Sequence, residues 1–223
     1  MFRVVALKAN SRAVRCLQLA ACLLLVKVTL SVLGNYPQYF PADFSAEFLQ
    51  GRETYFYRDY QWAFYPHLLT GPLSLILVPI LLSSRFLRTF PHWHRRLGRV
   101  QVLTVLLGVV PSGFWMALYS AGGPVAKVGF ATLAMWTGVC AAMGWRTAVK
   151  RRFREHRRWM ERCAVLLCSA IVIRVIGGFL TVTHIGGSET YPISAWVSWL
   201  VPLIVWECAR PLFKTRRTIV PNS

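Results

Sequence analysis

Acidic residues are scarce in this 223-residue chain, and charged residues of either sign are few. The sequence contains eight Asp and Glu residues, and only 15% of all residues are charged, whereas 55% are hydrophobic and the mean hydropathy is +0.44. A soluble domain of this length needs more polar surface than that, so the composition favours a membrane protein. The sequence also lacks a nucleotide-binding loop, a Ser-His-Asp spacing and paired carboxylates. These absences argue against a hydrolase or an ATPase. Whether the protein is an enzyme stays open, because none of these motifs indicates a reaction.

Six apolar runs are long enough to cross a bilayer, which takes roughly 20 helical residues for about 30 Å of hydrocarbon. They cover approximately residues 15–34, 64–82, 100–119, 126–145, 161–181 and 194–209. The six cysteines lie within these runs or at their ends, and no CxxC pair exists, so no disulfide framework is indicated. The sequence therefore predicts an all-α, polytopic membrane protein. Its parts are a six-helix transmembrane bundle over residues 15–210, a basic N-terminal segment at 1–14 and a basic tail at 211–223.

The basic residues are concentrated in alternate connections of this bundle. Of the 26 Lys and Arg residues, 21 fall in four segments, namely 1–15, 83–99, 146–162 and the tail after 209. Six alternating spans place all four segments on one side, which is the positive-inside asymmetry. Both termini are therefore expected in the cytoplasm, and the protein is expected in the plasma or inner membrane. The net charge of +18 is then explained by anionic lipid headgroups rather than by nucleic acid.

The segment at 35–62 is expected on the opposite side and is rich in aromatic residues. Phe44, Phe48 and Leu49 follow Asp43 at a spacing typical of a short amphipathic helix that begins at Asp43. Such a segment could anchor the protein at the membrane interface or cap a cavity between spans.

Prolines and small residues indicate irregular and close-packed spans. Pro72, Pro79 and Pro111 lie inside predicted spans, where each removes a hydrogen-bond donor and frees a carbonyl, so kinked or broken helices are expected. Small residues recur every four positions in the fourth span, which predicts a close helix contact through Ala134, Gly138 and Ala142.

Two similar motifs, "HRRLGR" at 94–99 and "HRRWMER" at 156–162, stand where the third and fifth spans begin. Helix N-termini carry a partial positive charge, and clustered arginines add to it, so anions are expected there. Lipid phosphates are the natural anions at that depth, and a cytosolic phosphate-bearing ligand is the alternative. The residues assigned to this role are His94, Arg95, Arg96, Arg99, His156, Arg157, Arg158 and Arg162.

Ionisable residues inside spans suggest a polar pocket. Lys27, Arg174 and Glu207 each lie within a predicted span, where a charge costs roughly 2.5–3.5 kcal/mol. Arg174 is expected about 10 Å below the outer end of its helix, near the depth of His67. We therefore expect His67 and Arg174 to line an outward-facing pocket beneath the aromatic segment. Glu207 is a third candidate ligand-binding residue, although at the inner end it can instead pair with arginines.

The histidines support a second hypothesis. His94 and His156 are expected at one inner depth, and His67 and His184 near the outer face, which is the arrangement of ligands needed for two stacked b-type haems. The sequence thus leaves three functional classes open. They are a binding, transport or accessory protein with a pocket, a haem- or quinone-linked electron-transfer protein, and a subunit or assembly factor of a membrane complex.

Several stretches together resemble a known family of bacterial membrane proteins. They are "HLLTGPLSLILVP" (67–79), "HRRLGRVQVLTVLLG" (94–108), "GFATLAMWTGVCAAMGWRTAVKRRFREHRRWMERCAVLL" (129–167), Arg174 and "SWLVPLIVWE" (198–207). In order and spacing they are similar to domain-of-unknown-function family 2306 over about residues 64–208. The resemblance implies a multi-span inner-membrane protein with no assigned reaction. Polar positions of the family pattern match His67, His94, His156, Arg174 and Glu207, whereas His184 has no counterpart.

Overall fold

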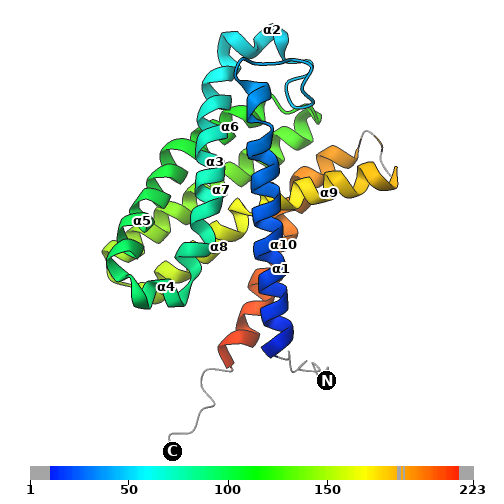
Figure 1. The fold of residues 1–223 in the computed structure, drawn as a ribbon. Coiled ribbons are helices and arrows are strands. Elements are labelled where there is room, and N and C mark those ends of the chain that lie inside the picture. Colours follow the sequence, from blue (N-terminus) through cyan, green and yellow to red (C-terminus); the bar gives the residue numbers. More distant parts are fainter. Residues whose placement is uncertain (1–10, 185–186, 188, 216–223) are drawn as a thin grey trace, which may run out of the picture.

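The computed structural model describes residues 11–184, 187 and 189–215; residues 1–10 and 216–223 of the two expected basic terminal segments lie outside this range. The described residues form helices joined by turns and contain no strand (Figure 1). In chain order the elements are α1 (Ser11–Gly34), η1 (Tyr36–Tyr39), α2 (Glu53–Tyr55), η2 (Phe56–Tyr60), α3 (Gln61–Leu82), α4 (Ser84–Thr89), α5 (Pro91–Leu103), η3 (Thr104–Val109), α6 (Val110–Leu118), α7 (Gly123–Val149), α8 (Phe153–Leu167), α9 (Ser169–Thr183) and α10 (Thr190–Thr215).

Among the described residues, five helical stretches are long and apolar enough to cross a membrane, which confirms the all-α, multi-span prediction. They cover Glu53–Leu82, Pro91–Leu118, Gly123–Val149, Phe153–Thr183 and Thr190–Arg210. The first of the six expected spans, at 15–34, stays a prediction. The apolar stretch found in α1, Leu19–Gly34, is shorter than the others. The cytoplasmic placement of both termini also stays a prediction.

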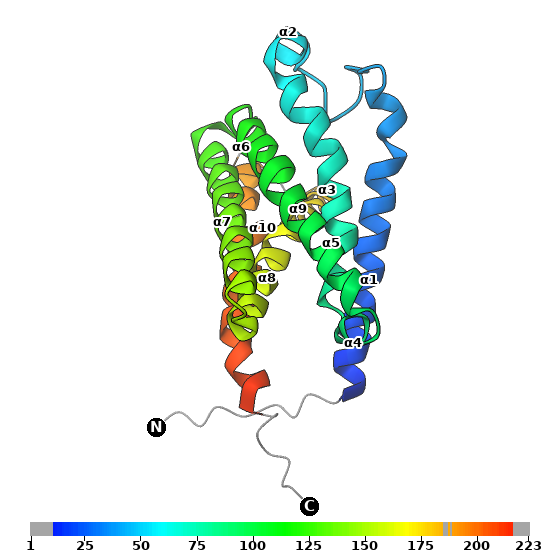
Figure 2. The same cartoon turned by 90° about the vertical axis from the view of Figure 1, so that its left-hand side faces the viewer.

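The bundle has two chemically different ends. The turn that contains α4, the turn at 150–152, the start of α1 and the end of α10 lie at one end, which we call the basic end (Figures 1 and 2). The segment at 35–60 and the turn between α6 and α7 lie at the opposite end, which we call the aromatic end. The two His-Arg-Arg motifs, at the starts of α5 and α8, therefore belong to the same end of the bundle.

The prediction of an amphipathic helix that begins at Asp43 is wrong. Residues 41–51 form successive turns, and the next helix begins at Glu53. The Asp43 carboxylate accepts hydrogen bonds from the Ser45 backbone N–H (2.9 Å) and hydroxyl (2.7 Å). This local turn competes with helix formation. The same hydrogen bonds hold the pKa of Asp43 below its usual value.

The prolines alter the helices without separating them. Three prolines lie inside α3, which remains continuous from Gln61 to Leu82. In the third span, α5 continues into the π-helical turn η3, which ends just before Pro111 in α6. The fifth span bends at Cys168, so α9 and the start of α10 lean sideways from the remaining helices (Figure 1).

A buried core holds these helices together at mid-height. Leu75, Val105, Cys140, Leu166 and Trp199 are each less than 10% exposed and come from α3, η3, α7, α8 and α10. The helices α7, α8 and α10 contact one another through such side chains. Van der Waals contacts between closely packed side chains are a main source of association between membrane helices.

The small-residue stripe of α7 is only partly as expected. Ala134 is buried, and a Cβ on Gly138 would lie 3.3 Å from Val110 in α6, so these two positions do face a neighbouring helix. Ala142 is exposed, and Ala141 is fully buried in its place. Steps of four residues drift by about 40° each around a helix with 3.6 residues per turn, so the second step, to Ala142, leaves the contact face.

Candidate functional site

His67 lies where α3 packs against η3 and α6. Its Nδ1 is 3.1 Å from the Ser112 hydroxyl oxygen, and that hydroxyl donates to the Gly108 carbonyl (2.5 Å). Because serine has one hydroxyl hydrogen and it is used on the carbonyl, we assign the imidazole proton to Nδ1. The His67 Nε2 then carries a free lone pair.

The close approach of α3 to α6 depends on glycine. A Cβ on Gly113 would lie 3.3 Å from the His67 ring, and a Cβ on Gly108 would lie 2.5 Å from the Thr70 side chain. A side chain at either position would push α3 outward. The "GVVPSG" stretch thus supplies both the acceptor that orients His67 and the space for its ring.

Tyr36 joins the aromatic segment to α3 beside His67. Its hydroxyl donates a hydrogen bond to the Leu68 carbonyl. That carbonyl has no helical partner because residue 72, four positions later, is a proline without an N–H. A second bond, from the Tyr65 hydroxyl to the Tyr39 carbonyl (3.1 Å), fastens the same turn. The sequence indicated freed carbonyls, but not that a tyrosine 32 residues away would satisfy one.

Arg174 approaches this region from α9. Its guanidinium donates to the Ala170 carbonyl in its own helix (2.7 Å) and takes part in none of the ion pairs found among the described residues. Its charge lies within electrostatic range of the His67 ring and of the Tyr36 and Tyr39 hydroxyls. Burial raises the pKa of Tyr39 above its usual value, and the positive charge of Arg174 opposes part of that rise. Three elements, α3, α9 and η1, thus bring a histidine, an arginine and two tyrosines into one region.

The aromatic segment packs against the start of α3 and forms a small core with it. The buried residues of this core, from the segment and from α3, are Tyr39, Ala46, Leu49, Phe56, Tyr60, Phe64 and Leu68. Arg52, which sequence reasoning did not single out, lies over the rings of Phe48 (4.9 Å) and Tyr60 (5.7 Å). This packing covers the aromatic end of α3, on the side from which Tyr36 reaches the Leu68 carbonyl.

Glu207 lies at the basic end, away from His67. Its carboxylate accepts from Arg162 Nε at 2.5 Å and lies 3.5 Å from Arg210. The Arg162 guanidinium also lies 4.8 Å from the centre of the Trp159 ring. Glu207 therefore joins α10 to α8 rather than lining a pocket with His67 and Arg174.

The remaining residues of the two basic motifs also lie at that end. His156 donates from Nδ1 to the Gly144 carbonyl of α7 (2.8 Å), and its ring lies within electrostatic range of His94. Exposed side chains surround them, namely Arg95, Arg96, Arg99, Arg157 and Arg158. His184 is exposed at the end of α9, in the hairpin that leans sideways. Over the described part of the chain, no group of three or more His, Cys, Asp or Glu side chains is placed to hold a metal ion.

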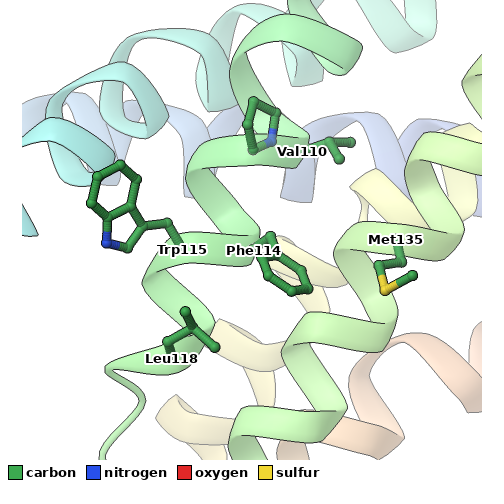
Figure 3. A pocket seen from close by; sticks show the side chains of 6 residues that line it. Val110, Phe114, Trp115, Leu118 and Met135 are labelled. Atoms are coloured by element: carbon green, nitrogen blue, oxygen red, sulfur yellow. The ribbon is translucent and has the colours of Figure 1, made fainter.

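The structure shows an apolar groove of about 530 Å³ between α6 and α7 (Figure 3). Its lining residues are Val110, Pro111, Phe114, Trp115, Leu118 and Met135. It contains neither His67 nor Arg174. Such a surface on a membrane-spanning helix pair is suited to lipid chains.

Comparison with known proteins yields one match. The family model described as "Predicted membrane protein (DUF2306)" matches residues 64–209, which run from the first turn of α3 almost to the end of α10. No curated protein and no solved structure matches the chain.

Proposed function

The chain belongs to the DUF2306 family of predicted membrane proteins, and on that premise we propose that it binds an anionic, partly apolar small molecule within the bilayer. The site is centred on His67 and Arg174 and is covered by the aromatic segment. The protein then acts as a binding protein, a transport protein or an accessory protein of another membrane protein.

The observation that carries this proposal is the unpaired charge of Arg174. An arginine within a span costs roughly 2.5–3.5 kcal/mol on insertion scales, and such residues usually face a partner, a cavity or a pathway. Glu207 and Arg162 form an ion pair at the basic end, whereas none of the ion pairs of the described residues includes Arg174. A carboxylate or phosphate of a ligand would supply the missing partner, since guanidinium binds either through two parallel hydrogen bonds.

His67 supplies the second element of recognition. Its Nδ1–H is held by Ser112, so Nε2 is an acceptor. A ligand with an anionic group for Arg174 and an O–H or N–H for His67 satisfies both side chains. Tyr36 and Tyr39 form the aromatic wall of the same region and suit an apolar portion of the ligand.

The orientation of the site is part of the proposal. The asymmetry of Lys and Arg supports an orientation with the basic end in the cytoplasm and the aromatic end outside, in a plasma or inner membrane. The exposed arginines of the two basic motifs then contact anionic lipid headgroups, and bilayer contact itself follows from the five apolar spans.

Two alternative functions predict different properties of the purified protein. A haem- or quinone-linked electron-transfer protein that uses His67, His94, His156 and His184 predicts a coloured or quinone-containing preparation. A complex subunit or assembly factor predicts a partner that co-purifies with the chain. A colourless, partner-free protein that still binds acids at Arg174 would favour the pocket.

Thermal unfolding of the protein in lipid nanodiscs tests the pocket. The probes are a medium-chain fatty acid, its 3-hydroxy derivative and the amine of the same chain length. We expect the acids to raise the unfolding temperature, the hydroxy acid most, and the amine to leave it unchanged. Arg174→Gln should abolish the shift, Arg174→Lys should keep part of it, and His67→Ala should remove the advantage of the hydroxyl.

Arg99→Gln is the matched control, since it removes an exposed arginine at the basic end and should leave the shift intact. The proposal fails if the amine and the acids act alike, or if Arg174→Gln responds like the unaltered protein.

A further inference from the structure

Helix α1 lies at one edge of the bundle and presents an apolar face away from it (Figure 2). Its main contacts are with α3, α9 and η1, and only Leu25 and Thr29 are buried among its described side chains. Exposed apolar residues recur along the outward face at intervals of four and three, namely Leu19, Leu23, Val26, Leu30 and Leu33. This spacing forms one continuous stripe along a helix.

Lys27 lies on the same outward side, close to the middle of the apolar stretch Leu19–Gly34. In a helix with 3.6 residues per turn, it is about 160° around the axis from each of the two buried residues of α1. Its side chain is accordingly exposed, and it takes part in none of the ion pairs found among the described residues.

A lysine in this position is unusual if α1 crosses the bilayer, as the sequence predicts. Charged side chains within spans generally face the bundle interior or pair with an opposite charge, because a charge is costly in hydrocarbon. Lys27 points away from the bundle, and about 10 Å of helix separates it from Gly34, the nearer end of α1. Lipid alone would explain the apolar stripe, whereas the lysine beside it calls for a partner with a negative charge.

Neither this chain nor a second copy of it supplies that negative charge. Glu207, the carboxylate that the sequence places inside a span, is already paired with Arg162. Two α1 helices packed face to face would bring like charges together. We propose that the outward face of α1 binds a transmembrane helix of another protein, and that this helix carries an aspartate or glutamate at the depth of Lys27.

The apolar stripe and the lysine have different parts in this interaction. Residues spaced by four and three on two helices interlock side by side, which gives close packing in lipid as in water. The ion pair adds selectivity, because a partner helix without an acid would leave the lysine unpaired. The proposal uses neither His67 nor Arg174, so it stands or falls separately from the anion site.

Energy transfer in lipid vesicles at neutral pH tests this proposal with a model peptide. The full-length protein carries a fluorescent donor at its N-terminus, and the acceptor-labelled peptide is a span of about 20 Leu and Ala residues with one central Asp. Peptides with Asn or Leu at the same position serve for comparison. We expect the Asp peptide to associate about tenfold more strongly than the Leu peptide, a typical size for polar contacts between membrane helices.

Variants of Lys27 assign the effect to its charge. Lys27→Gln should remove the preference for Asp, and Lys27→Arg should keep it. Lys27→Glu should reverse it, so that a peptide with a central Lys binds best. Lys127→Gln is the matched control, since it removes an exposed lysine near the start of α7 and should retain the preference for Asp.

Size-exclusion chromatography and thermal unfolding of each variant separate a folding defect from a loss of binding. The proposal is overturned if the three peptides associate equally with the unaltered protein, or if Lys27→Gln still prefers Asp. Efficient cross-linking of two copies through Leu23→Cys, in a cysteine-free background, would overturn it too, because a second copy would then cover this face.

Discussion

The hydrogen bond from Tyr36 to the Leu68 carbonyl offers the sharpest test of how the aromatic segment is held over α3. Tyr36→Phe removes the donor and keeps the ring, which lies 6.5 Å from that of Tyr39. The carbonyl is then left without a partner, because Pro72 cannot supply an N–H. Loss of such a partner costs about 1–3 kcal/mol. For a chain of this size that is a fall in unfolding temperature of about 2–4 °C per kcal/mol.

The Pro72→Ala variant tests whether Pro72 is the reason that the Leu68 carbonyl needs Tyr36. An alanine N–H can bond to the Leu68 carbonyl within α3, so Tyr36→Phe should cost clearly less in that background. The difference between the two backgrounds, a coupling of about 1 kcal/mol, is the quantity to measure by thermal unfolding in detergent. Tyr57→Phe, at an exposed tyrosine of the same segment, should change nothing. An equal cost of Tyr36→Phe in both backgrounds would refute the assignment of the freed carbonyl.

Three further predictions concern orientation, the basic end and the His67 ring. In a cysteine-free background, Ser45→Cys should react with a membrane-impermeant maleimide on intact cells and Arg152→Cys only after permeabilisation; the reverse pattern would invert the proposed orientation. Glu207→Gln should lower stability by about 1 kcal/mol or less, because its ion pair with Arg162 is partly exposed, whereas Glu189→Gln, at an exposed position outside the ion pairs found among the described residues, should have no effect in the same unfolding assay. Ser112→Ala removes the acceptor that orients His67, so it should reduce the extra thermal shift given by the 3-hydroxy acid while leaving the shift given by the simple acid; an unchanged hydroxy-acid effect would show that the ring needs no such support.

Span positions could be read from the sequence because they depend on length and hydropathy alone. The runs at 64–82, 100–119, 126–145, 161–181 and 194–209 each coincide with a helical span of the structure to within one residue. Membrane spans permit this because an unpaired backbone in hydrocarbon is so costly that an apolar run has no alternative to a helix. Details within a span do not follow in the same way. The bend at Cys168 lies in the middle of a continuous apolar run, and α9 beyond it contacts α10 and α1, so no local pattern marks it.

The structure of the aromatic segment is harder to predict than the spans, because local and long-range contacts compete there. Asp43 satisfies a helix-start pattern, yet its carboxylate is used by Ser45 and the chain turns instead. The sequence shows that the segment is rich in aromatic residues, but a partner such as Leu68 for Tyr36 lies at a separation that a single sequence does not reveal. Freed carbonyls can be located from prolines, whereas the donor that reaches them cannot.

The candidate site shows why the scarcity of acidic residues matters. With eight carboxylates for 26 basic side chains, most cations must rely on water, lipid headgroups or a ligand. At the basic end the exposed arginines have water and headgroups within reach, and Glu207 neutralises Arg162. Arg174 lies within an apolar helical stretch, is exposed on the surface of the bundle, and has no ion-pair partner among the carboxylates of the described residues. A charged side chain within a span usually faces a partner, a cavity or a pathway, and this is the reason for proposing an anionic ligand beside Arg174.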